Sequence, residues 1–281
     1  MVDSAMITNQ GGRKNNEDYI RKAVHPTGEC FILCDGLGGH ECGEVASSTV
    51  AETVATLFEN NGDYPDFLKD AFEMAQATLL DLQKRKNLEN AMKTTLVVLV
   101  VTAEHVKWAH IGDSRLYHFF KNATKYERTR DHSMVQILCD MGEITDAQIR
   151  THVDRNKVLR VMGAPWSDKS YDLSGLLERM SGHEFALMTD GFWEYVNEAE
   201  MMQLINETET ALEWLEKMQQ IVESRADMRS TDNYSCICVR IRGEDEKTSE
   251  IYPNTEPMYD GTKNPTERTL KMPAMKDEFF I

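Results

Sequence analysis

The sequence has no apolar run approaching the about 20 residues that cross a bilayer, and its start lacks the basic-then-apolar layout of a secretory leader. It also lacks a basic stripe, because 47 acidic residues against 31 Lys and Arg give a net charge of −16. Nucleic acid is therefore not an expected partner, since its binding depends on clustered cations. We expect a soluble cytoplasmic protein with no membrane or nucleic-acid partner.

Several catalytic signatures are missing as well. The eight histidines show no HExxH spacing, and the glycine-rich stretch 35–40 lacks both the third glycine of GxGxxG and a following Gly-Lys-Ser/Thr, so a zinc hydrolase and a nucleotide loop are unsupported. The six cysteines include no CxxC pair and no Cys-x5-Arg loop of a thiol phosphatase. Those within apolar runs are interpreted as small buried hydrophobes in a reducing compartment: Cys30, Cys34, Cys236 and Cys238.

Hydrophobic periodicity predicts strands and helices in an order that sets the fold class. The stretch from Thr94 to Phe120, rich in Val, Leu and aromatics, predicts three consecutive antiparallel strands. Further strands are predicted at about 5–9, 17–24, 29–35, 184–190 and 234–241, and helices at about 46–57, 68–82 and 133–141, from Thr145, from Asn197, and at 211–222. Strands and helix pairs without a repeating βαβ rhythm indicate an α+β fold of antiparallel sheets covered by helices.

The composition changes after Arg242. Four of the seven prolines fall in the last 39 residues, among many charged and polar side chains. Such a segment buries too little apolar surface to offset the entropy cost of ordering it. We therefore predict a globular domain over 1–242 and a flexible tail over 243–281. The apolar end of the tail, Lys276–Ile281, either docks on a partner or has no role.

Carboxylates recur where apolar runs end. FILCDG, WAHIGDS and FALMTDG end at Asp35, Asp113 and Asp190, while Asp232 comes just before the last strand and Glu17 before the second. A buried strand leading into a carboxylate is costly unless the charge is paired or binds a metal. A single Asp-Gly is normally an ordinary turn, but the repetition favours a shared site. Oxygen ligands gathered at strand ends suit hard cations such as Mg²⁺ and Mn²⁺.

Taken together, these segments resemble the PP2C (PPM) family of metal-dependent protein serine/threonine phosphatases. The matching stretches follow the family's order: 12–18, 35–40 with 43–46, 112–115, 131–133, 155–156 with 162–163, 190–191 and 232–233. They span about 12–240, and the Gly-Gly-His-x-x-Gly-Glu-x-Ala form resembles the bacterial branch. The resemblance implies a hydrolase that acts on phosphoproteins in signalling, with a catalytic domain over 1–242. It also implies a four-layer sandwich, in which two antiparallel β-sheets pack face to face between helix pairs.

The resemblance further implies a role for each matching position. Asp35 would bridge two Mn²⁺ or Mg²⁺ ions, and Arg13 would bind the substrate phosphate. The other metal ligands would be Glu17 and the Gly36 carbonyl on one ion and Asp190 and Asp232 on the other, with Asp113 and Asp190 holding a third ion, while Asp18 and Asn233 would orient the ligands. Two metals about 3.5–4 Å apart can share a hydroxide that attacks phosphorus in line, without a phosphoenzyme.

Two positions depart from the family pattern. Leu37 stands where animal members carry a His that is thought to protonate the leaving group. The general acid therefore stays open between His40, three residues later, and a metal-bound water. Val153 replaces a usual Pro in the segment 152–156 of the flap, which would alter loop stiffness and substrate choice more than chemistry.

Alternative functions make different predictions. A pseudophosphatase that only binds phosphoproteins predicts a lost metal ligand. All four acidic ligands expected for the two metal ions are nevertheless present in the sequence. A scaffolding module predicts that deleting 243–281, rather than substituting Asp35→Asn, abolishes function. For an active enzyme the expected partners are phosphoprotein substrates and a counterpart serine/threonine kinase, because the family usually opposes one.

Overall fold

The computed structural model describes residues 1–37, 42–88, 91–120, 125–166 and 170–243. Its strands are β1 (Val2–Asn9), β2 (Asp18–His25), β3 (Gly28–Leu37), β4 (Lys93–Thr94), β5 (Leu96–Thr102), β6 (His105–Ile111), β7 (Arg115–Phe120), β8 (Tyr126–Arg128), β9 (Asp172–Leu173), β10 (Leu177–Glu178), β11 (His183–Met188) and β12 (Tyr234–Ile241). Its helices are α1 (Cys42–Asn61), α2 (Phe67–Lys86), α3 (Met134–Asp140), α4 (Asp146–Ile149), α5 (Asp190–Trp193), α6 (Glu198–Glu207) and α7 (Ala211–Arg225). His40 and, apart from Gly243, the predicted tail lie outside the described residues.

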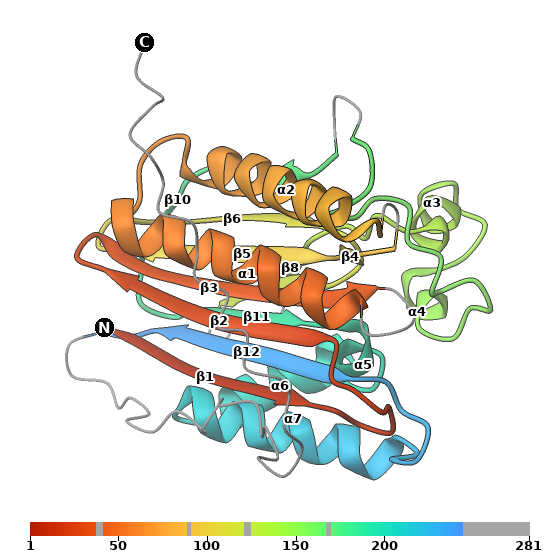
Figure 1. The fold of residues 1–281 in the computed structure, drawn as a ribbon. Coiled ribbons are helices and arrows are strands. Elements are labelled where there is room, and N and C mark those ends of the chain that lie inside the picture. Colours follow the sequence, from red (N-terminus) through yellow and green to blue (C-terminus); the bar gives the residue numbers. More distant parts are fainter. Residues whose placement is uncertain (38–41, 89–90, 121–124, 167–169, 244–281) are drawn as a thin grey trace, which may run out of the picture.

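The strands form two antiparallel sheets with helices on both outer faces. One sheet has the order β10-β6-β5-β3-β2 and the other the order β1-β12-β11-β7-β8. Figure 1 shows α1 and α2 above the first sheet and α6 and α7 below the second. This arrangement confirms the predicted four-layer α+β sandwich. Within the described part of the chain, no helix combines the length and the apolar character needed to cross a membrane.

Strand alternation divides the interior into three apolar layers. In β12, Cys236 and Cys238 pack with the helices of the second sheet, whereas Ile237 and Val239 lie between the two sheets. Successive side chains of a strand point to opposite faces, so one strand serves two layers. The four cysteines of the apolar runs are buried, and all six are free thiols. Their interpretation as small buried hydrophobes is confirmed.

The segment 94–120 contains three longer strands, as predicted, but they are not consecutive partners. β5 pairs with β6, whereas β7 joins the other sheet and pairs with β8 and β11. The chain crosses between sheets at Gly112, whose φ of 109° disfavours a side chain and where a Cβ would meet Thr95 Cγ2 at 2.5 Å. The crossing places Asp113 at the junction of the two sheets.

Caps confirm two of the predicted helix starts, those at Ser133 and Asn197. Ser133 Oγ accepts a hydrogen bond from the Gln136 N–H, and Asn197 forms a capping box with Glu200. The elements that the sequence did not reveal are too short to show a period: β4, β8, β9, β10 and α5 have two to four residues each.

Candidate metal centre

The predicted carboxylates are carried by five separate segments. Asp35 is near the end of β3, Asp113 follows β6, Asp190 begins α5, and Asp232 precedes β12. Glu17 precedes β2, and its neighbour Asp18 lies directly opposite Asp35 in the β2–β3 ladder. Burial, followed by negative charge on Asp18, Asp190, Asp113 and Asp232, raises the pKa of Asp35. The fold therefore brings the predicted acidic residues into one electrostatic group.

Asp18 connects the two sheets beneath this group. Its Oδ2 accepts hydrogen bonds from Ser235 Oγ at 2.7 Å and from Thr189 Oγ1 at 3.0 Å. Thr189 is the residue before Asp190, so Asp18 fixes the strand end from which that carboxylate emerges. Burial nevertheless raises the pKa of Asp18 to about 8, because its two hydroxyl partners compensate only part of the lost hydration.

Asn233 holds the loop between β1 and β2. Its Oδ1 accepts from the Glu17 N–H at 2.8 Å, and its Nδ2 donates to the carbonyls of Gln10 and Asn15 at 2.7 and 2.9 Å. One amide side chain thus satisfies three backbone groups that no strand pairs. The contact sets the position of Glu17 relative to the start of β12.

Two threonines bind the backbone of Asp35, so its carboxylate stays available to the group of acidic residues. The Asp35 N–H donates to Thr95 Oγ1 at 2.9 Å, and the Asp35 carbonyl accepts from Thr94 Oγ1 at 2.8 Å. Thr95 Oγ1 also lies 2.8 Å from Ser114 Oγ. The Thr95 hydroxyl therefore joins the end of β3 to the turn that carries Asp113.

The glycine that follows Asp190 is required by a close backbone approach. A Cβ at Gly191 would lie 2.1 Å from the carbonyl oxygen of Asn233. At Gly36, after Asp35, a Cβ would lie 2.4 Å from the Gly43 carbonyl oxygen. The Asp-Gly pairs thus let backbone segments from different parts of the chain approach closely at the centre. Metal ligation by the Gly36 carbonyl stays a prediction.

Burial and mutual repulsion dominate the electrostatics. Burial, followed by the charge of Asp190, raises the pKa of Asp113 well above its usual range, and burial with the charge of Asp232 raises the pKa of Asp190 to about 6. Arg13 donates from Nη2 to Asp232 Oδ2 at 2.6 Å, and its side chain is 57% exposed. Divalent cations would relieve this repulsion, and oxygen-only donors suit Mg²⁺ or Mn²⁺.

The carboxylate groups lie farther from one another than the ligands of a single ion would. Among the described residues, the three-ligand group whose atoms all lie within 4.8 Å of one another is His110, His132 and Asp172, outside the carboxylate group. A two-ion centre divides its ligands between ions about 3.5–4 Å apart. Each such ion also keeps several waters and binds one or two carboxylates. The donor set therefore fits two hard cations, while the individual ligand assignments stay predictions.

The structure adds residues to which the sequence pattern assigned no role. Arg115 donates from Nε and Nη2 to Asp131 at 2.9 and 2.6 Å, and its guanidinium lies 3.5 Å from the ring centroid of Trp193. Trp193 Nε1 in turn donates to the Asp113 carbonyl at 3.1 Å. The buried Arg115–Asp131 pair thus supports the turn at Asp113. The sequence signal was the Asp131-His132-Ser133 stretch, whose chemistry is not evident from spacing alone.

Glu194 was also missed. It lies four residues after Asp190, and burial together with the charge of Asp190 raises its pKa to about 7. Arg155 of the predicted flap donates from Nε to Glu194 Oε1 at 2.7 Å. Glu194 therefore joins the flap segment to α5. Its i, i+4 spacing from Asp190 was the available signal.

Comparisons with known proteins agree with this architecture. The PstP serine/threonine protein phosphatase of Mycobacterium tuberculosis is 26% identical over 264 residues, covering 93% of this chain and 48% of PstP, so the chain spans about half the length of that relative. The crystal structure of the serine/threonine phosphatase Stp1 from Staphylococcus aureus has a TM-score of 0.75 and 30% identity, covering 86% of this chain and 96% of Stp1.

A third comparison shows the same fold at lower identity. The PstP catalytic domain in complex with 2 manganese ions has a TM-score of 0.72 and 24% identity, covering 86% of this chain and 99% of that domain. The family model for protein phosphatase 2C matches residues 9–229, which is most of the chain. The chain therefore belongs to the protein phosphatase 2C family.

Proposed function

We propose that this chain is a protein serine/threonine phosphatase that hydrolyses phosphoserine and phosphothreonine at a centre of two Mn²⁺ or Mg²⁺ ions. The observation that carries the proposal is the convergence of carboxyl groups from five separate segments, in which burial and the charge of neighbouring carboxylates raise the pKa of Asp35, Asp113 and Asp190. A buried acidic group of this kind needs cations, and phosphate needs positive charge where it binds. The names of the relatives PstP and Stp1, and the manganese in the PstP domain, support the same conclusion.

The proposed ligands follow from the resemblance to the family, and the grouping of these carboxylates in the fold supports them. Asp35 would lie between the ions, with Glu17 on one side and Asp190 and Asp232 on the other, while Asp113 and Asp190 would hold a third. The bound ions would supply an activated water at neutral pH and neutralise charge on the phosphoryl group. Asp18 and Asn233 would keep the ligands in place through the hydrogen bonds described above.

Arg13 would orient the substrate. Its guanidinium is planar and exposed, and it already bonds an oxygen anion, the Asp232 carboxylate. A phosphate offers the same acceptor geometry, so Arg13 can turn from Asp232 to the non-reacting phosphate oxygens. We expect Arg13→Ala to raise KM more than it lowers kcat.

Hydrolysis of phosphopeptides by the full chain tests this function. We expect Mn²⁺-dependent release of phosphate from phosphoserine and phosphothreonine peptides, loss of activity in EDTA, and loss in Asp35→Asn. Asp81→Asn, an exposed carboxylate on α2 paired with Arg85, is the matched control and should leave activity unchanged. Full activity in EDTA, or in Asp35→Asn, would refute the proposal.

Partners follow from the same reaction. We propose phosphoproteins as substrates and a serine/threonine kinase as the enzyme that supplies them, because a phosphatase of this class can act only on kinase products. Comparing the phosphoproteome with and without active enzyme would identify the sites. Deleting 243–281 in parallel would show whether the tail docks on a partner, since docking predicts altered substrate choice with unchanged hydrolysis of short peptides.

A further inference from the structure

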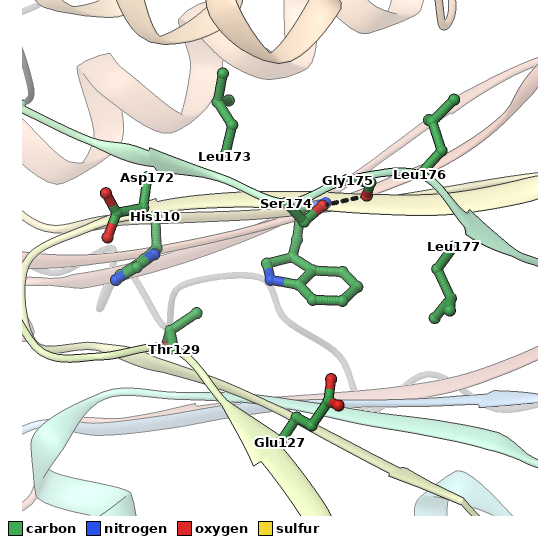
Figure 2. A pocket seen from close by; sticks show the side chains of 10 residues that line it. His110, Glu127, Thr129, Asp172, Leu173, Ser174, Gly175, Leu176 and Leu177 are labelled. Atoms are coloured by element: carbon green, nitrogen blue, oxygen red, sulfur yellow. Dashed lines mark hydrogen bonds between the residues drawn. The ribbon is translucent and has the colours of Figure 1, made fainter.

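A cavity of about 360 Å³ lies at the side of the sandwich, where the edges of the two sheets meet. Its lining comes from β6, from the segment between β9 and β10, and from β8 with the residue that follows it. Figure 2 shows Asp172 at one end of the cavity, Leu177 at the other, and Glu127 of β8 across from them. The lining includes none of the carboxylates of the candidate metal centre, so the cavity is a separate surface.

Apolar side chains form one wall of the cavity and are left open. Leu173 and Leu176 are 51% and 71% exposed, and Trp108, which also lines the cavity, is only partly buried. Large apolar side chains that gather on an exposed surface are typical of a place where another chain segment binds. The wall therefore offers apolar area that an additional segment can cover.

The charged side chains among the described residues of this lining are both acidic. They belong to Glu127 and Asp172, whose side chains are 78% and 55% exposed. Burial opposes ionisation of Asp172, but the hydrogen bond from His132 outweighs it and lowers the pKa of Asp172. His110, also in the lining, stays neutral because burial and the neighbouring His132 lower its pKa to about 4. The cavity therefore suits a segment that is both basic and apolar.

The tail after Gly243 contains a segment of this composition. Residues 268–276, Arg-Thr-Leu-Lys-Met-Pro-Ala-Met-Lys, include three basic residues, two methionines and one leucine, and no acidic residue. The stretch before it, 244–267, has seven acidic residues against two lysines, and 277–281 adds two more acidic residues. Methionine side chains are flexible and adapt to irregular apolar surfaces. Charge and apolar character thus both select 268–276 within the tail.

The described part of the chain ends close to the cavity. Ile241, the last residue of β12, accepts a hydrogen bond from the Gly182 N–H at 2.9 Å. Gly182 follows Leu177 of the cavity by five residues, which span at most about 18 Å. A flexible chain of 24 residues, the length of 244–267, spans about 25–30 Å on average. The basic segment can therefore reach the cavity of its own chain.

We propose that residues 268–276 dock in this cavity of the same chain. Their basic side chains would contact Glu127 and Asp172, and their apolar side chains would cover Trp108 and the exposed leucines. A segment held by a short flexible linker has a local concentration in the millimolar range. A contact with a dissociation constant of about 0.1 mM would then leave only about a tenth of the tails undocked. Docking within one chain therefore needs no more than a weak contact.

Trypsin digestion of the native full chain, followed by mass spectrometry, tests the docking. Lys271 lies within the proposed segment and Lys247 lies outside it, so each chain contains its own reference site. A synthetic peptide of 244–281 gives the ratio of the two cleavage rates without the domain. We expect cleavage after Lys271, relative to Lys247, to be about tenfold slower in the full chain than in the peptide.

Substitutions in the cavity should remove this protection. Glu127→Lys reverses one of its charges, and Leu176→Asp replaces its most exposed leucine with a charged side chain. Both residues are exposed, so the fold should be kept, which circular dichroism would check. Glu216→Lys makes the same charge change at an exposed position of α7 and is the matched control. This control should be protected like the wild type.

Carbodiimide crosslinking of the wild type locates the contact without any substitution. The reagent joins a lysine amine to a carboxylate when the two groups are in contact. We expect links from Lys271 or Lys276 to Glu127 or Asp172, within single chains.

Three results would overturn the proposal: equal cleavage ratios in the full chain and the peptide, full protection in Glu127→Lys, or lysine links spread over carboxylates elsewhere on the domain. Protection or links that occur only at high protein concentration and in crosslinked dimers would assign the cavity to the tail of a second copy. That result would also overturn docking within one chain.

Discussion

The two ends of β11 and β12 carry charged side chains in opposite electrostatic environments. At one end, Asp190 and Asp232 lie among other carboxylates. At the other end, Glu184 and Arg240 are ladder partners with both side chains fully buried, and their charged atoms lie 3.2 Å apart. Arg242 lies 3.7 Å from the same Glu184. At this end, therefore, the negative charge is compensated by arginines.

The contrast separates carboxylates that are paired within the fold from carboxylates that are proposed to bind metal. A buried charge with a fixed partner of opposite sign contributes to the fold, although its net effect on stability is small or negative. A buried group of like charges raises the free energy of the folded state and persists where a ligand compensates it. The same two strands thus serve as scaffold at one end and carry the proposed metal site at the other, and substitutions at the two ends should have different consequences.

The largest expected effect is on catalysis by Asp35→Asn. Removing the proposed central ligand should lower kcat/KM by about 10³–10⁴-fold, the scale seen when an essential catalytic group is lost. Without added metal the variant should be at least as stable as the wild type, because one repelling charge has gone. Phosphopeptide kinetics and urea unfolding measure the two quantities. A variant that is destabilised and still active would show that Asp35 belongs with the structural carboxylates.

The opposite behaviour is expected at the far end. Arg240→Met leaves Glu184 buried without its nearest cation and should cost about 3–5 kcal/mol of unfolding free energy. Specific activity of the folded fraction should stay unchanged. The double variant Arg240→Met with Glu184→Met removes both charges and should recover most of the loss. Urea unfolding of the three proteins measures this, and equal instability of the single and double variants would contradict the charge explanation.

Histidines at the far end provide a pH test. Burial, with the charge of His183, lowers the pKa of His118 to about 4. A folded-state pKa below the unfolded value of about 6.5 means that this contribution is complete above pH 6.5 and is lost as the pH falls towards 4. Between pH 7 and 5 the wild type should therefore lose about 2 kcal/mol through this group.

The variant His118→Phe isolates that contribution. His118 is stacked on Phe185 with centroids 4.7 Å apart, and a phenyl ring can keep that contact. The variant should lose about 2 kcal/mol less than the wild type between pH 7 and 5, as measured by urea unfolding. The same pH dependence in both proteins would show that His118 remains uncharged or is hydrated across this range.

The sequence indicated which acidic residues come together better than it indicated the connections around them. The acidic residues could be found because each ends or precedes an apolar run. The layers could be found because most helices and strands are long enough to show their hydrophobic period. The crossing of β7 to the second sheet was missed, because local alternation is the same whichever sheet a strand joins. The Arg115–Asp131 pair, the link from Arg155 to Glu194 and the two threonines at Asp35 depend on contacts between distant segments, which no local pattern encodes.

The smallest expected effect lies at the boundary between scaffold and site. Thr95→Val removes the hydroxyl that accepts from the Asp35 N–H and contacts Ser114, while keeping the volume of the side chain. A buried donor left without its partner costs about 1–3 kcal/mol, so stability should fall by about that amount. Activity should also fall, by up to about tenfold, because the Asp35 and Asp113 segments lose a shared anchor.

Thr102→Val, at the far end of β5, is the matched control. Its hydroxyl accepts from the Glu104 and His105 N–H groups, so the variant should lose stability with activity unchanged. Equal activity losses in the two variants would show that the hydroxyl at Asp35 contributes only to the fold.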